Sequence, residues 1–78
     1  MAVKKQPKEG EAPLRQLRER AGLTQEELAR RCGIPLRTYQ RWETGETAAR
    51  PSIRQIKALC RELNIPVEEL PDELGPPR

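Results

Sequence analysis

The chain has no histidine and no phenylalanine, and its 78 residues include only two cysteines, one tyrosine and one tryptophan. Two cysteines are too few for a disulfide scaffold, and without histidine they cannot complete a four-ligand metal site. Cys32 and Cys60 each fall at an apolar position of a predicted helix, which favours small buried side chains. The sequence also lacks a glycine-rich phosphate loop, and Cys32 has no evident base partner. We therefore expect no metal, no cofactor and no enzymatic activity.

Long apolar runs are absent as well. No stretch approaches the ~20 residues that a membrane-spanning helix needs. The first residues, "MAVKKQPKEGEAP", lack the apolar segment of a signal peptide. We expect an intracellular protein of the cytoplasm, with no membrane partner.

The sequence contains few residues that can form a hydrophobic core. Apolar residues make up 35% of the chain and charged residues another 35%. Strand formers are sparse, whereas Leu, Ala, Glu, Gln and Arg are common, and this favours helices. The length allows one small domain. We predict an all-α fold, a compact bundle of five helices.

The helical segments lie between two irregular ends. Residues 1–12 are polar and aperiodic, which is typical of a flexible N-terminal arm, and residues 72–78 form a short proline-rich tail, so the domain spans 13–71. The predicted helices, with their caps, are residues 13–21, 24–32, 36–44, 52–63 and 67–70. The second and fourth begin with capping boxes, "TQEE" and "SIRQ".

The second and third helices are three residues apart. Gly33 begins this connection and can adopt the left-handed conformation that ends a helix. A short helix, a tight glycine turn and a second helix form the helix-turn-helix arrangement.

The third helix carries both aromatic residues of the chain, interleaved with arginines in "GIPLRTYQRWETGE". At about 100° per residue, Tyr39, Trp42 and Glu43 share one face, while four polar side chains occupy the opposite face. Those four are Arg37, Gln40, Arg41 and Thr44. Two readings compete: a basic strip on which bases stack, or a helix whose aromatics enter the core. Because other large apolar residues are few, we predict that the aromatics belong to the core and the arginines point outward.

Glu43 falls close to the predicted core face, which an acidic residue does not occupy without a partner. The same helical geometry places Arg18 on the inward edge of the first helix. We predict a partly buried Arg18–Glu43 ion pair that joins the two helices and fixes their geometry.

Positive charge is distributed unevenly along the chain. Residues 13–45 contain seven arginines and four glutamates, whereas residues 46–78 contain five basic and six acidic residues. The balances, +3 and −1, put the positive charge in the first two-thirds of the domain, which is evidence for a polyanionic partner. A solvated surface rich in ion pairs would have the same composition, so charge alone leaves both readings open.

These residues resemble a known family. The stretch "LRQLRERAGLTQEELARRCGIPLRTYQRWETG", followed by "RPSIRQIKALCRELNIPVEEL", is similar to the DNA-binding domain of phage repressors, the Cro/cI or XRE-type helix-turn-helix proteins. The similarity covers residues 14–70. It implies a five-helix, lambda-repressor-like all-α domain whose second and third helices form the motif. It also implies that helix 36–44 enters the major groove of double-stranded DNA.

The resemblance also implies which residues meet DNA. The base-reading positions are Leu36, Arg37, Thr38, Gln40 and Arg41. The phosphate-contacting positions are Gln25, Thr44, Thr47, Arg50 and Ser52. Three features depart from the family pattern: Pro35 replaces a capping residue, Leu36 replaces a polar reader and could touch a thymine methyl or simply pack, and the loop after the third helix is long and begins with acidic Glu46.

The sequence therefore predicts a sequence-specific transcriptional regulator, a repressor associated with the nucleoid. One helix reads only a few base pairs, so we expect a palindromic operator and a homodimer whose contacts are Val67, Leu70 and Leu74. The alternative is a protein-interaction module on the same fold, such as an antitoxin or an adaptor. The low total charge and the acidic C-terminal third favour that alternative slightly.

Overall fold

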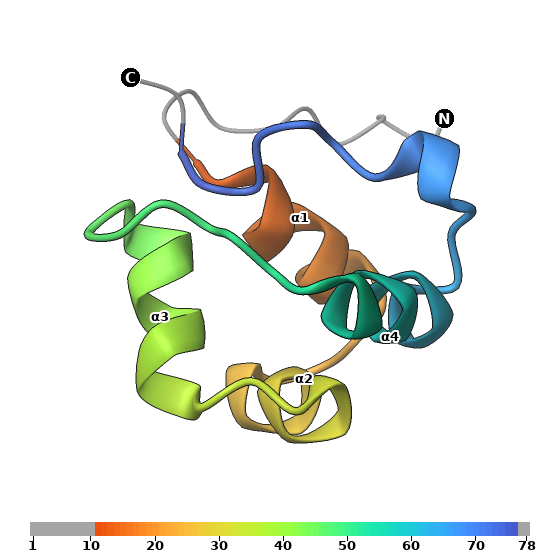
Figure 1. Cartoon of the computed structure of the whole chain (residues 1–78), viewed down its shortest axis with the longest axis horizontal. Helices are drawn as coiled ribbons and strands as arrows, with labels where there is room; N and C mark the ends of the chain where they lie inside the picture. The colour runs from red at the N-terminus through yellow and green to blue at the C-terminus, as the bar shows by residue number, and fades with distance from the viewer. Residues whose placement is uncertain (1–10, 77–78) are drawn as a thin grey trace, which may run out of the picture.

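The computed structural model describes residues 11–76, and within this range it contains four α-helices and one short 3₁₀ turn (Figure 1). The elements are α1 (Pro13–Arg20), α2 (Gln25–Cys32), α3 (Leu36–Thr44), α4 (Ile53–Leu63) and η1 (Val67–Glu69). The described range has no strand, so the all-α prediction is confirmed. The prediction of five helices is wrong. The last segment lies between Pro66 and Pro71, and the short stretch between these prolines forms only one 3₁₀ turn.

Two helix starts follow directly from side-chain capping. The Thr24 hydroxyl accepts the Glu27 N–H at 3.1 Å, and the Glu27 carboxylate accepts the Thr24 N–H at 2.9 Å. Ser52 and Gln55 make the same reciprocal pair at the start of α4, at 3.2 and 2.9 Å. Each box satisfies two backbone donors that a helix start leaves free, so both predicted starts are confirmed.

The ends of α2 and α3 depend on glycine. Gly33 has φ +70° and Gly45 has φ +83°, in the left-handed region that other residues rarely adopt. Between α2 and α3 the chain therefore turns within three residues, and the two helices pack against each other. After Gly45 the chain turns away from α3 into the loop that leads to α4.

One hydrophobic core joins all four helices. Its largest fully buried side chains are Tyr39, Leu14, Leu28 and Leu59, and Trp42 is buried beside them. The aromatic residues of α3 thus lie in the core. Cys32 is also buried there, and burial raises the pKa of its thiol to about 11, so the thiol stays neutral at pH 7.

The residues at the two ends of the described range are part of this core. Ala12, predicted in the mobile arm, is buried; residues 1–10 of that arm lie outside the described range. Residues 71–76, the C-terminal strap, pass beside the start of α1 (Figure 1). There the Leu74 carbonyl accepts the Leu14 N–H at 3.0 Å, and the Leu74 side chain is only 5% exposed.

Leu74, which the sequence suggested as a dimer contact, is thus a core residue of this chain. Prolines prevent the strap from forming a helix, but an extended chain can still bury one side chain in a core. The strap also reaches the end of α3, because a Cβ on Gly45 would lie 2.8 Å from a ring carbon of Pro76. Residues 77 and 78 of the predicted tail lie outside the described range.

We predict that Leu74→Ala lowers the free energy of unfolding by about 2–5 kcal/mol, because it removes a buried side chain and leaves a cavity. Urea denaturation followed by the fluorescence of Trp42 measures the change. Ile53→Ala is the control: Ile53 is 73% exposed, so this change should stay within about 0.5 kcal/mol. Equal, small effects of the two substitutions would contradict the burial of Leu74.

Candidate nucleic-acid interface

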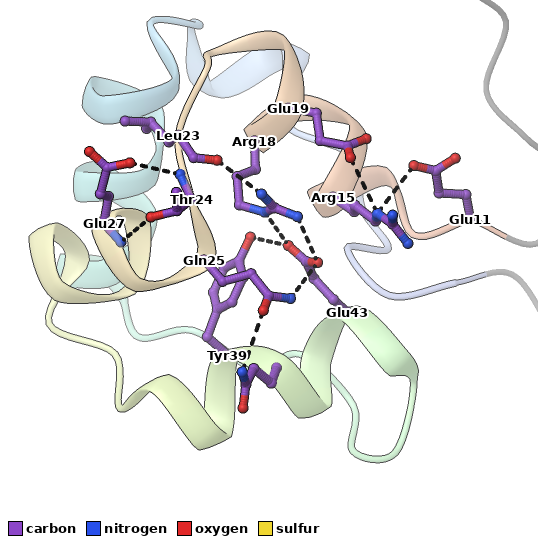
Figure 2. Close-up of polar contacts among 11 residues, drawn as sticks. Glu11, Arg15, Arg18, Glu19, Leu23, Thr24, Gln25, Glu27, Tyr39 and Glu43 are labelled. Carbon is purple, nitrogen blue, oxygen red and sulfur yellow. Dashed lines mark hydrogen bonds and ion pairs between the residues drawn. The ribbon is translucent and has the colours of Figure 1, made fainter.

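A buried polar network holds the inner face of α3. Arg18 donates from Nε to Glu43 Oε2 at 2.9 Å and from Nη1 to the Leu23 carbonyl at 2.9 Å (Figure 2). The Tyr39 hydroxyl donates to Glu43 Oε2, and Gln25 Nε2 donates to Glu43 Oε1 at 3.0 Å. The predicted Arg18–Glu43 pair is thus present. The Glu43 carboxylate receives donors from α1, α2 and α3.

The network keeps its central carboxylate charged although that carboxylate is buried. Burial by itself raises the pKa of Glu43, but hydrogen bonds from Arg18, Tyr39 and Gln25 outweigh it and hold that pKa below its ordinary value. The hydrogen bond to Glu43 raises the pKa of Arg18. Burial, followed by the bond to Glu43, raises the pKa of Tyr39. At neutral pH the site therefore holds a carboxylate, a guanidinium and a neutral phenol.

Because the carboxylate is fixed to α1 and α2, α3 cannot rotate about its axis, and its other side faces outward. Leu36, Arg37 and Gln40 are exposed on α3, whereas Thr38 and Arg41 are half-buried. Within residues 11–76 the guanidinium of Arg37 has no carboxylate within 4.0 Å. The five predicted base-reading residues thus lie on one helix, with Leu36, Arg37 and Gln40 exposed on it.

Gln25, predicted to contact a phosphate, has a second set of partners. Its Nε2 donates to Glu43, and its Oε1 accepts a longer hydrogen bond, 3.4 Å, from Gln40 Nε2. Gln25 thus connects the buried network to the outer face of α3. The sequence gives no signal for this link. Gln25 is 18 positions from Glu43 and 15 positions from Gln40, and only the crossing of α2 and α3 brings them into contact.

The other predicted phosphate contacts lie in two places. Ser52 lies close to the turn between α2 and α3, since its capping partner Gln55 donates to the Gly33 carbonyl at 3.3 Å. Thr47 and Arg50 are exposed in the loop between α3 and α4. Thr47, Arg50 and Ser52 thus offer two hydroxyl groups and a guanidinium, which are donors of the kind that bind phosphate.

Thr44 and Arg41, at the end of α3, make contacts that the sequence did not predict. The Thr44 hydroxyl donates to the Arg41 carbonyl at 3.1 Å and accepts the Glu46 N–H at 3.3 Å. The Glu46 carboxylate lies 3.4 Å from Arg41 Nε. One predicted base-reading arginine is therefore paired with an acid of the chain itself.

We predict that Glu43→Gln lowers the free energy of unfolding by about 3 kcal/mol at pH 7, because it leaves the guanidinium of Arg18 buried without a counter-ion. The folded-state pKa of Glu43 lies below the ordinary value of 4.5, so its contribution is complete above pH 4.5 and is lost as pH falls through the folded-state value.

Urea denaturation of both proteins from pH 7 down to about 3 measures the difference between them. The lowered pKa of Glu27, caused by its hydrogen bonds to Thr24, is common to both proteins and cancels in this difference. The difference should shrink below pH 4.5, the ordinary pKa of the group. A difference that stays constant with pH would contradict the assignment to Glu43.

Comparison with known protein families identifies the family to which this chain belongs. A family model described as helix-turn-helix matches residues 14–70, which include all four α-helices apart from the first residue of α1. Curated proteins and solved structures gave no match. Within residues 11–76 no helix is long and apolar enough to cross a membrane, and no group of three or more His, Cys, Asp or Glu side chains could hold a metal ion. The chain belongs to the XRE-type, Cro/cI-like helix-turn-helix family, whose members are DNA-binding regulators and not typically enzymes.

Proposed function

We propose that this chain binds double-stranded DNA sequence-specifically and represses transcription by occupying an operator. The observation that carries the proposal is the division of α3 into two faces. The buried network fixes one face, and Arg37, Gln40 and Leu36 are exposed on the other. A helix held in this way can enter the major groove as a rigid body. The location that goes with this function is the cytoplasm, on nucleoid DNA.

The exposed side chains have the chemistry that base recognition needs. A guanidinium can donate two hydrogen bonds to guanine O6 and N7, and a primary amide can pair with adenine N6 and N7. Arg37 and Gln40 supply these groups, and Leu36 offers an apolar contact to a thymine methyl. Thr38 and Arg41 are half-buried and are proposed to contribute from the same helix.

Phosphate contacts would then set the register of α3 in the groove. Arg50 and Thr47 in the loop, Ser52 at the start of α4, and Thr44 are proposed for this role. Gln25 Nε2 donates one of its two N–H groups to Glu43, so the second N–H is the one proposed to contact a phosphate. Binding through arginines releases counter-ions, so affinity should fall steeply with salt.

A palindromic operator read by a homodimer completes the proposal, because a single recognition helix spans only a few base pairs. Of the contacts that the sequence suggested, Val67 is 58% exposed and Leu70 is half-buried at the edge of the core. Both lie at η1, so we place the dimer contact there, without Leu74.

One observation favours a second candidate, an adaptor or antitoxin that binds protein. Four carboxylates are exposed in and after η1, and phosphates would repel them. They are Glu68, Glu69, Asp72 and Glu73. Such a surface would suit a basic protein partner.

Selection of bound duplexes from a random DNA pool separates the two functions. The regulator enriches a palindromic motif. A chain that enriches no motif even at low salt, where non-specific contacts are strongest, is the adaptor.

We predict that Arg37→Ala weakens binding to the selected duplex by about 1–3 kcal/mol and relaxes the preference at one base pair. Titration of labelled duplex measures the affinity for the selected sequence and for a shuffled one. Arg20→Ala, which removes an exposed arginine at the end of α1, is the control for charge and should leave the preference unchanged. Full discrimination by the Arg37 variant would remove Arg37 from base reading.

A further inference from the structure

We infer that Glu46 is a positioning residue for Arg41 and that it raises the ability of the interface to discriminate between DNA sequences. The inference rests on the proposed function, since it concerns how the same face of α3 treats different duplexes. It starts from the position of an acid: Glu46 lies two residues beyond the end of α3, where phosphates of a bound duplex would repel its carboxylate.

The turn after α3 is built to hold Glu46 in that place. Three donors converge on the Arg41 carbonyl: the Gly45 N–H at 3.0 Å, the Thr44 hydroxyl at 3.1 Å and the Thr47 N–H at 3.4 Å. The Glu46 N–H in turn donates to the Thr44 hydroxyl at 3.3 Å. The left-handed Gly45, with Pro76 of the strap packed against it, completes the turn. The backbone of Glu46 is therefore fixed beside the last turn of α3.

The carboxylate uses this position to approach one edge of the Arg41 guanidinium. The nearest pair of atoms is Arg41 Nε and Glu46 Oε2, 3.4 Å apart. Neither terminal nitrogen of Arg41 donates a hydrogen bond to another group of residues 11–76. The end of the guanidinium that can form the two-bond contact with guanine thus stays available, while its other edge is held.

Glu46 affects the two kinds of DNA contact differently. Its charge repels the backbone of every duplex and competes with phosphates for Arg41, so it weakens binding that depends on phosphates alone. A guanine at the right place offers O6 and N7 to the terminal nitrogens without displacing the carboxylate. Specificity is a difference between affinities, and an acid that penalises the wrong contact increases that difference.

Arg37 and Arg41 are therefore not equivalent. Arg37 has no acid beside it within the described range and adds affinity on any sequence as well as reading a base. Arg41, held by Glu46, contributes chiefly where a base can receive it. Arg37 thus contributes mainly to affinity, and Arg41 contributes mainly to discrimination between sequences.

The test is Glu46→Gln, measured on two duplexes: the one selected from the random pool and a shuffled one of the same length and composition. The variant should bind the shuffled duplex more tightly, and the ratio of the two affinities should fall by about fivefold, the size expected for coupled neighbours. In an Arg41→Ala background the same substitution should strengthen binding to both duplexes equally and leave the ratio unchanged.

Glu19→Gln is the matched control. Glu19 Oε2 lies 3.5 Å from Arg15 Nε in an exposed pair on α1, so the variant removes the same charge from the same kind of contact away from α3. It should leave the ratio unchanged. Glu46 is exposed, and thermal unfolding of the variant verifies that the fold is intact.

The outcomes separate this inference from the proposed function. A wild-type chain that enriches no motif overturns both. A wild-type chain that discriminates, with an unchanged ratio for Glu46→Gln, overturns the role of Glu46 alone. An equal fall of the ratio with and without Arg41 also overturns it, because the effect would then not pass through Arg41.

Discussion

The buried carboxylate of Glu43 is the constraint on which the rest of the molecule depends. An acid that is only 8% exposed must keep its charge compensated, and its compensation comes from Arg18 on α1, Gln25 on α2 and Tyr39 on α3 itself. The hydrogen bonds from these three residues to Glu43 fix how α1, α2 and α3 cross. Such a pair contributes little net stability compared with apolar residues of the same volume, but it specifies one arrangement. That arrangement decides which side of α3 faces outward.

The same constraint separates the two roles of a nine-residue helix. Tyr39, Trp42 and Glu43 attach α3 to the core, and Leu36, Arg37 and Gln40 are exposed on the rest of its surface. The only acid in α3 is thus turned away from the outer face. The acid that lies beside that face, Glu46, comes from the following turn, where hydrogen bonds to the Arg41 carbonyl position it. The network holds the inner face of α3, and the turn holds its C-terminal end, through different chemistry.

Local signals in the sequence predicted much of this structure. Capping residues and glycines marked where α2, α3 and α4 begin or end, because these contacts are made within a few residues. Helical geometry also placed Arg18 and Glu43 on inward faces. The contacts of Gln25 and Leu74 were missed because they depend on how helices cross and on an extended strap that no periodicity reveals. The fifth helix was over-predicted, since two prolines leave room for only a 3₁₀ turn.

The central claim is that α3 meets DNA with one face while the network holds the other. NMR titration of the chain with the selected duplex tests it directly, through the side-chain N–H signals of Arg37, Arg41 and Trp42. The account predicts large shifts for the two arginines and an unchanged indole signal. A strongly shifted Trp42 indole with unchanged arginine signals would contradict it, because the aromatic face would then be the one in contact with DNA.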